Sequence, residues 1–360
     1  MTPVNPFKDP HLTQKLLSKI RTLNNTPLNI MEVCGTHTMS IYKNGLDKLL
    51  PPSIQLLSGR GCPVCVTDIG YIDAAIKLSH RKEVMLATFG DMLRVPGSTA
   101  SLNSAKANGA DIQVVYSPLD CITLSQTHRH KEVVFLGIGF ETTAPSIALT
   151  LQKAMALSIP NFSLLLSLKT MPYTMESLIF DDSVVIDGFI CPGHVAAIIG
   201  TAPFNALAEK YHVPMVIAGF EALDIVSAIY TLIEMTHTHS YTCKNLYTRV
   251  VKPQGNTKAA ALLDHYFKVD TSFWRGLGEL DKTGLSLRSD FNNFNALLKF
   301  DLTFPQVKAA SGCMCGEVLK GFKKPSDCPL YKTSCTPEKP IGACMVSSEG
   351  TCMNFYKYNN

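Results

Sequence analysis

The chain has 360 residues, of which 46% are hydrophobic and 17% are charged, and its formal net charge is +4. This length is enough for two or three domains with a sizeable buried core. The small net charge, without any run of Lys and Arg, does not favour a nucleic-acid partner. The N-terminus lacks the apolar segment of a secretory signal, and no apolar run reaches the roughly 20 residues of a membrane span. We therefore expect a cytoplasmic protein without a membrane partner.

Short apolar runs rich in β-forming residues recur along the chain and predict strands. In chain order they lie at residues 53–58, 83–89, 111–117, 132–140, 162–168, 183–190 and 213–220. Segments with helical spacing lie between several of these runs, at 69–78, 145–157 and 194–210, and another follows at 291–300. Because strands that alternate with helices indicate βαβ units, we predict an α/β fold with two similar parallel-sheet domains.

Shifts in composition suggest where the domains begin and end. We assign residues 30–125 and 130–245 to the two α/β domains, joined near the polar stretch 125–131. Residues 1–29 and 246–360 form accessory segments and a third, Cys-rich domain. The end of the chain has too few apolar residues to bury a core of its own, so we expect something else to hold it together.

Unusual segments follow several of the predicted strands. GRGCPVC follows the first strand in that series and TFGDMLRVPG the second, while GFETTAP, CPGHV and GFEALD follow later ones. In open parallel sheets, ligand sites form at the carboxyl ends of the strands. These segments therefore predict a cleft where the two domains face each other.

The twelve cysteines are unevenly spread, and six of them lie between Cys313 and Cys352. In a reducing cytosol, thiols serve metal binding or transient redox chemistry more often than structural disulfides. Four thiolates usually hold a cubane iron–sulfur cluster, and six thiols in this segment leave two spare. Zinc is the alternative, but the C-x₂-C pairs usual for zinc are absent from this tail. We therefore favour an iron–sulfur cluster.

Seven distinctive segments and the Cys-rich tail together span most of the chain; the segments are MEVCGTHT (31–38), GCPVC (61–65), TFGDMLRVPG (88–97), GFETTAP (139–145), CPGHV (191–195), AGFEALD (218–224) and WRGLG (274–278). In these segments the chain resembles the HypD family of hydrogenase maturation proteins. The resemblance implies two similar sheet domains and a third domain that carries a [4Fe–4S] cluster. The implied cluster ligands are Cys313, Cys328, Cys335 and Cys352, with Cys315 and Cys344 as a redox-active pair. Spacing does not distinguish Cys313 from Cys315 as the ligand.

The resemblance also implies a function. Members of the family work with the small chaperone HypC, and with HypE as cyanide donor and HypF upstream of it, to assemble the Fe(CN)₂CO group of [NiFe]-hydrogenases. We therefore expect a scaffold with redox activity, monomeric on its own, rather than a conventional turnover enzyme.

By the same resemblance, Cys34 holds the iron being assembled, and His37 acts as a nearby proton donor or supporting partner. A Cys with a nearby His is also typical of a protease-like nucleophile, or of an ordinary buried thiol. Low-spin iron that carries CO and cyanide is soft and matches a thiolate ligand, and Gly35 lets such ligands approach the backbone. The candidate hydrogen-bond donors to cyanide are Thr36, Thr38 and Arg94.

Cys62 and Cys65 form a C-x-x-C pair beside a predicted helix start, which lowers the pKa of a thiol. As a dithiolate the pair can hold the iron together with Cys34, and as a disulfide it stores two electrons. We expect the iron–sulfur domain to set this state through Cys315 and Cys344. Arg60 stands where the family usually has Pro, and it brings a positive charge to this loop.

The remaining candidate site residues each have a structural alternative. They are Asp91, Arg94, Glu141, His194 and Glu221. Asp91 and Arg94 can form an ion pair, and carboxylates such as Glu141 and Glu221 can cap helix starts. His194 can be an ordinary turn histidine. We assign no role to Cys121, Cys191 and Cys243.

Two other functions remain open from the residues alone. One is an iron–sulfur-linked thiol–disulfide oxidoreductase that acts on a partner protein through the CPVC pair. The other is a zinc-stabilised α/β binding module. An acid-labile sulfide assay separates the second of these from any iron–sulfur protein.

Overall fold

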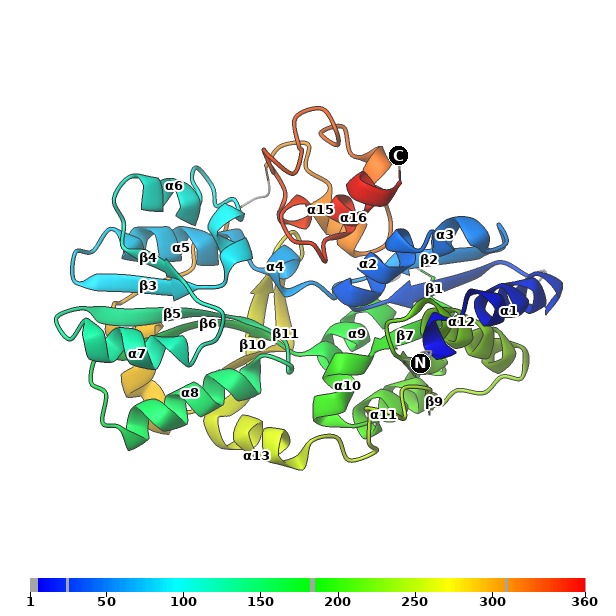
Figure 1. Cartoon of the computed structure of the whole chain (residues 1–360), viewed down its shortest axis with the longest axis horizontal. Coiled ribbons are helices and arrows are strands. Elements are labelled where there is room, and N and C mark those ends of the chain that lie inside the picture. Colours follow the sequence, from blue (N-terminus) through cyan, green and yellow to red (C-terminus); the bar gives the residue numbers. More distant parts are fainter. Residues whose placement is uncertain (1–5, 24–25, 182–184, 308–309, 360) are drawn as a thin grey trace, which may run out of the picture.

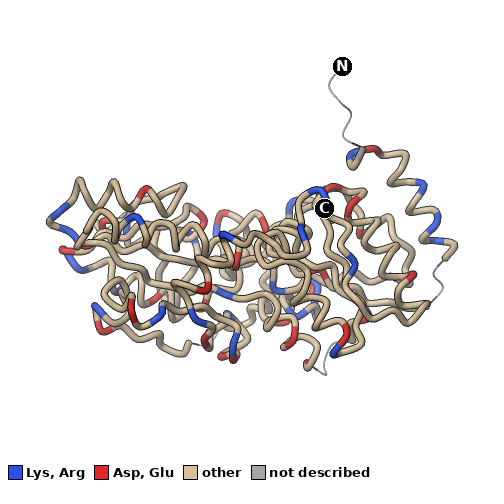
Figure 2. The backbone as a smooth tube through the Cα atoms, turned by 90° about the horizontal axis from the view of Figure 1, so that it is seen from below, with Lys and Arg blue, Asp and Glu red and all other residues tan. Residues whose placement is uncertain are grey.

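Two β-sheets organise the chain, which a computed structural model describes over residues 6–23, 26–181, 185–307 and 310–359. The sheets lie side by side along the long axis, and the C-terminal tail lies over the region between them (Figure 1). Acidic and basic residues are interspersed along both halves (Figure 2), in keeping with the small net charge. Within the described residues, no helix is both long and apolar enough to cross a membrane.

The first sheet, sheet A, is entirely parallel, with strand order β2-β1-β7-β8-β9. Its strands are β1 (Leu28–Glu32), β2 (Ile54–Ser58), β7 (Gly188–Pro192), β8 (Met215–Ala218) and β9 (Cys243–Asn245). Its helices are α1 (Pro10–Leu23), α2 (Gly35–Lys43), α3 (Leu46–Leu49), α10 (Gly193–Ile199), α11 (Ala202–Tyr211) and α12 (Ala222–His237), preceded by the 3₁₀ turn η1 (Pro6–Lys8). The central helix α12 packs against α1 on one side and against β7 and β8 on the other.

The second sheet, sheet B, is mostly parallel, with strand order β10-β11-β6-β5-β3-β4. Four parallel strands are β3 (Val84–Thr88), β4 (Ile112–Val114), β5 (Glu132–Gly139) and β6 (Phe162–Lys169), and the antiparallel hairpin β10 (Phe267–Trp274) and β11 (Gly278–Leu287) extends the β6 edge. Strand β5 is buried from Val133 to Gly139, as expected for a parallel strand covered on both faces. The covering elements are α5 (Ile69–Ser79), η2 (Gly90–Arg94), α6 (Leu102–Ala107), α7 (Asp120–Thr127), α8 (Ala144–Ala156), α9 (Met171–Ile179), α13 (Thr257–Tyr266), η3 (Ser289–Phe294) and α14 (Ala296–Lys299).

The predicted α/β class with parallel sheets is confirmed, and a strand overlaps each of the seven predicted runs. Part of the run 183–190 lies outside the described residues, and β7 begins at Gly188. The predicted helix 194–210 is two helices, because Gly200 adopts a φ of +80° and ends α10. The sequence prediction omitted β1, β9 and the β10–β11 hairpin.

The two sheets do not follow the predicted ranges 30–125 and 130–245. Each range contributes strands to both sheets: β1 and β2 pair in sheet A with β7 to β9, whereas β3 and β4 join β5 and β6 in sheet B. The chain therefore crosses between the sheets after β2, after β6 and after β9. The CPVC segment forms a short helix, α4 (Pro63–Val66), on the first of these crossings.

The tail consists of short helical elements joined by turns. They are α15 (Cys315–Leu319), η4 (Pro325–Asp327), η5 (Ala343–Met345) and α16 (Thr351–Tyr358). Its buried residues, such as Val318 and Met345, belong to one apolar cluster with Met31 of sheet A and Leu86 of sheet B. The tail therefore has no separate core among the described residues, and it depends on both sheets for burial.

Candidate metal and thiol site

Cys34 lies between the end of β1 and the start of α2, at the N-cap position of that helix. It is 8% exposed, and its backbone N–H donates to Glu32 Oε2 at 3.0 Å. Burial, together with the nearby Glu349 carboxyl, raises the pKa of the Cys34 thiol to about 12. Without a cation nearby, Cys34 is therefore a protonated thiol at neutral pH.

The CPVC loop lies directly beside Cys34. The Gly35 N–H donates to the Gly61 carbonyl at 3.1 Å. A Cβ atom at Gly61 would overlap the backbone of Cys34, so this close approach requires glycine. The structure thus brings together two thiol segments that leave neighbouring strands of sheet A.

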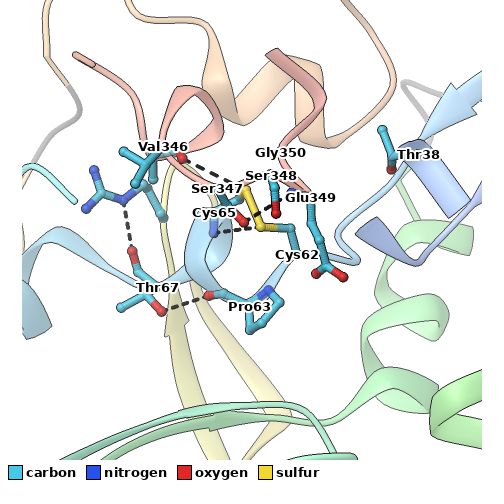
Figure 3. Close-up of a disulfide and its surroundings, with 12 residues drawn as sticks. Thr38, Cys62, Pro63, Cys65, Thr67, Val346, Ser347, Ser348, Glu349 and Gly350 are labelled. Carbon is cyan, nitrogen blue, oxygen red and sulfur yellow. Dashed lines mark hydrogen bonds between the residues drawn. A yellow bond between two sulfur atoms is a disulfide. The ribbon is translucent and has the colours of Figure 1, made fainter. Parts of the chain in front are cut away.

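Cys62 and Cys65 are joined by a disulfide, and both are buried (Figure 3). The Cys65 N–H donates to Cys62 Sγ at 3.2 Å, and Cys65 Sγ lies 4.0 Å from the Ala343 carbonyl oxygen of the tail. Of the two predicted states of this pair, the structure contains the disulfide. The described residues include no group of three or more Cys, His, Asp or Glu placed to share one metal ion.

Arg60 extends away from these thiols toward α9. Its side chain is 2% exposed, and Nη1 donates to Ser177 Oγ at 3.0 Å. Burial lowers the pKa of Arg60 to about 10, so the guanidinium is still charged at neutral pH. Arg60 therefore ties the CPVC loop to a helix that begins at the end of β6.

Two carboxyl groups flank Cys34, the buried Glu32 and the partly buried Glu349, and neither was predicted from the sequence. Glu349, in the tail, accepts a hydrogen bond from Thr36 Oγ1 at 2.7 Å, and Figure 3 shows its loop lying over the disulfide. Glu32, at the end of β1, accepts one from Thr38 Oγ1 at 2.5 Å. Burial raises the pKa of Glu32 to about 7 and also raises that of Glu349. The sequence signal that could have identified Glu32 is a single Glu within an otherwise apolar strand.

These bonds bear on the predicted donors to cyanide. The hydroxyls of Thr36 and Thr38 donate to carboxyl groups, and Arg94 donates to tail carbonyls, at 3.0 Å from Nη2 to Val346 O. All three predicted donors are thus engaged within the protein in this state. The ion pair considered between Asp91 and Arg94 is not among those that the described residues form.

His37 points from α2 toward the end of β8. Its Nε2–H donates to the Gly219 carbonyl at 2.9 Å, and burial lowers the pKa of the ring to about 4. The Phe220 ring lies between two histidines, with centroids 4.7 Å from His37 and 4.0 Å from His194. The ring is therefore uncharged at neutral pH, and its Nε2 proton is engaged with a backbone carbonyl.

Glu141 and Glu221 occupy helix starts, the structural alternative considered from the sequence. Glu141 Oε1 accepts from the Met171 N–H of α9 at 2.8 Å, and burial raises its pKa to about 7. Glu221 is the N-cap of α12 and forms a capping box with Asp224. Neither carboxyl has a described contact with Cys34 or with the CPVC disulfide.

The tail cysteines surround one small cavity of about 20 Å³. Its thiols are Cys313, Cys315, Cys328, Cys335 and Cys352, and its apolar lining includes Val318, Leu330 and Met345. A Cβ atom at Gly342 would overlap Cys315 Sγ and lie 3.0 Å from Cys313 Sγ, so glycine keeps this wall open. All four predicted cluster ligands line the cavity, and so does Cys315.

The sixth tail cysteine, Cys344, lies beside this group. It is fully buried and shares hydrogen bonds with Cys315 and Cys352, which raise the pKa of Cys344 and lower that of Cys352. The predicted redox pair is therefore in contact. Soft thiolates around an apolar pocket are the donor set of an iron–sulfur cluster, whose four ligands bind separate iron atoms rather than one ion. The residues present fit such a group.

Arg275 links the CPVC helix to the tail, and the sequence analysis passed over it within the WRGLG segment. Its Nε donates to Thr67 O at 2.8 Å and its Nη2 to Pro96 O at 2.7 Å. It also lines, with Cys313 and Cys315, a second small cavity of about 110 Å³. A buried cation thus lies between the end of the CPVC helix and the tail thiols.

The fold and the site define a class: an α/β protein that gathers a buried cysteine, a C-x-x-C disulfide and a thiol-lined tail, as proteins that handle metals or electrons through sulfur do. A family model described as HypD, hydrogenase formation hypA family, matches residues 11–359. The hydrogenase maturation factor HypD of Rhodobacter capsulatus is 43% identical over 98% of this chain and 97% of that protein. The HypD factors of Cupriavidus necator and Escherichia coli are each 42% identical over 99% of this chain, and over 96% and 97% of their own lengths. The chain belongs to the HypD family of hydrogenase maturation factors.

Proposed function

We propose that this chain is a scaffold on which the Fe(CN)₂CO group of [NiFe]-hydrogenases is assembled, together with HypC and with cyanide delivered by HypE downstream of HypF. Iron, the cargo, is held by Cys34 and by Cys62 and Cys65 once their disulfide is reduced. The observation that carries the proposal is the Gly35–Gly61 backbone hydrogen bond, which holds the Cys34 segment against the CPVC loop beneath the tail.

The environment of Cys34 suits a metal that arrives from outside. A raised thiol pKa keeps the sulfur protonated until a cation displaces the proton, so iron binding releases a proton at Cys34. The carboxyl groups of Glu32 and Glu349 lie close enough to influence that thiol and can accept the proton. Gly35 and Gly61 let Glu349 and the CPVC loop pack closely against the Cys34 segment.

We further propose that Cys313, Cys328, Cys335 and Cys352 hold a [4Fe–4S] cluster, which supplies one-electron redox chemistry when bound. The contacts support exchange between the two thiol pairs, because Cys65 Sγ lies 4.0 Å from the carbonyl that precedes Cys344. Cys344, once deprotonated, would attack the disulfide, and Cys315 would resolve the mixed disulfide. Cys62 and Cys65 would leave as thiols, with the two protons coming from the tail pair. A low-potential one-electron carrier protein, acting twice, would then supply two electrons to the Cys315–Cys344 disulfide, and two protons from solvent would restore both thiols.

Infrared spectroscopy of anaerobically purified chain with its small partner tests the iron site. We expect bands of metal-bound cyanide and CO in the wild type and their loss in Cys34→Ala. Cys121→Ala is the matched control, since Cys121 is also fully buried but packs in the separate apolar cluster of sheet B. If the bands persist in Cys34→Ala, the iron is held elsewhere.

A second candidate function is an iron–sulfur-linked thiol–disulfide oxidoreductase that acts on a partner protein. The observation in its favour is the Cys62–Cys65 disulfide beside the tail thiols. Such a reductase turns over many equivalents of a disulfide substrate when supplied with dithionite, whereas a scaffold does not. Acid-labile sulfide in the purified protein excludes a purely zinc-stabilised module.

A further inference from the structure

The hydroxyl of Tyr331 is buried next to the tail cysteines without a hydrogen-bond partner among the described residues. A buried hydroxyl without a partner costs about 1–3 kcal/mol, so most such groups in proteins are satisfied. A tyrosine hydroxyl ordinarily has a pKa of about 10, so the group is a protonated donor at neutral pH. What it lacks is an acceptor.

Backbone contacts fix Tyr331 between two of the predicted cluster ligands. The Tyr331 N–H donates to Cys328 O at 3.0 Å, and Tyr331 forms a β-bridge with Cys335. The Cys335 N–H donates in turn to Leu330 O at 2.8 Å. The position of this ring is thus set by the loop from Cys328 to Cys335 rather than by solvent.

Ring contacts pack the side chain against α16, the helix that carries the third ligand. Phe355 and Tyr356 of α16 meet the Tyr331 ring edge-on, with centroids 5.8 and 6.2 Å away, and the same helix carries Cys352. Tyr331 lines the small cavity together with Cys328, Cys335 and Cys352. Apart from Tyr331 itself, the side-chain acceptors of the residues that line this cavity are sulfur atoms.

We propose that the Tyr331 hydroxyl donates a hydrogen bond to a sulfur of the tail's iron–sulfur centre, either that of Cys352 or an inorganic sulfide, and thereby raises the reduction potential of the centre. This inference rests on the proposed [4Fe–4S] cluster. Reduction adds one electron, and so one negative charge, to the centre. A donor to sulfur stabilises the more negative state more strongly, and hydrogen bonds to sulfur are among the factors that set cluster potentials.

The test is an anaerobic redox titration of the full-length protein with its cluster, followed by electron paramagnetic resonance. Tyr331→Phe removes one oxygen atom and keeps the ring. We expect its midpoint potential to fall, so that at the wild-type midpoint the ratio of reduced to oxidised centre drops by up to roughly tenfold, which is about 59 mV for one electron. Tyr356→Phe is the matched control, and its midpoint should equal that of the wild type.

Iron and labile sulfide are measured in all three proteins to keep the outcomes distinct. Equal cluster content with a lowered midpoint only in Tyr331→Phe supports the inference. Equal content with unchanged midpoints overturns the role of Tyr331 and leaves the proposed cofactor intact. A wild type without labile sulfide overturns the cofactor, and the role of Tyr331 with it.

Discussion

At the scale of single residues, two glycines and two carboxyl groups create the surroundings of Cys34. A Cβ atom at Gly35 would lie 2.5 Å from Glu349 Cβ, and one at Gly61 would overlap the Cys34 backbone. Glycine at both positions lets the tail and the CPVC loop approach the thiol from two sides. Glu32 and Glu349 then place two carboxyl groups beside the thiol, which favours a cation there over an anion.

The buried carboxyl of Glu141 predicts a pH-dependent stability. Its folded pKa of about 7 lies above the ordinary value of 4.5, so the folded state binds the proton more tightly than the unfolded state. The stability it contributes is full below pH 4.5 and is lost as the pH rises through 7. Glu141→Gln should therefore match the wild type in acid and exceed it by about 3 kcal/mol at pH 8.

Urea unfolding of the reduced chain at pH 5, 6, 7 and 8 measures this difference. Glu83→Gln is the control, because Glu83 is exposed on the surface, and it should shift the free energy of unfolding little at any pH. A gap between Glu141→Gln and wild type that does not change with pH would contradict the assignment.

At the scale of elements, the tail is held on the sheets by a few long-range contacts. Arg94 of η2 donates to the carbonyls of Pro337 and Val346, and Thr36 of α2 donates to Glu349. The Tyr42 ring of α2 meets Phe355 of α16 edge-on at 5.7 Å. Short helices of this kind are only marginally stable in isolation. The long-range contacts therefore decide where the tail thiols lie.

Arg94→Ala should loosen the tail without unfolding the sheets. Hydrogen bonds from a charged donor contribute about 1.5–3 kcal/mol, so amide exchange in residues 337–350 should accelerate by roughly tenfold or more. Arg81→Ala is the matched control, since Arg81 also donates to a carbonyl, that of Phe300, but lies away from the tail. Hydrogen exchange measured by mass spectrometry compares the amide protection of both variants with that of the wild type. Equal protection of the tail in Arg94→Ala and wild type would rule out this anchoring role.

At the scale of the whole molecule, the site exists because the chain crosses between two sheets. The first crossing carries the CPVC helix, and Arg275 from beyond the third crossing binds the end of that helix at Thr67 O. The tail then covers the same region and shares one apolar cluster with both sheets. Thiols more than 250 residues apart in the sequence thus meet in one place.

Removal of the proposed cluster should affect one part of this molecule more than the rest. The tail has little core of its own, so it should depend on the cluster for its stability. Chelation of iron under reducing conditions should therefore increase amide exchange in residues 312–358. Exchange should also increase in the segments that the tail touches, 34–38 and 61–67. The central strands β5 and β6 should keep their protection. Uniform loss of protection over both sheets, or none in the tail, would show that the cluster does not support the tail.

The predicted strands were recognisable because parallel strands buried on both faces read as continuous apolar runs, as β5 does from Val133 onward. The β10–β11 hairpin escaped prediction because much of it is exposed and its sequence is charged and Gly-rich. Which strands share a sheet was not readable, since buried apolar runs are nearly interchangeable as neighbours. The predicted ranges therefore cut across both sheets.

The sequence by itself determined that this protein is α/β, and it predicted which cysteines to expect at the site, because residue type and spacing are local properties of a chain. Only the tertiary structure decided that the CPVC loop lies against Cys34, that Glu32 and Glu349 flank that thiol, and that Arg275 and Tyr331 adjoin the tail cysteines. Those contacts join segments far apart in sequence. They depend on which buried faces fit together, and one-dimensional patterns do not record that fit.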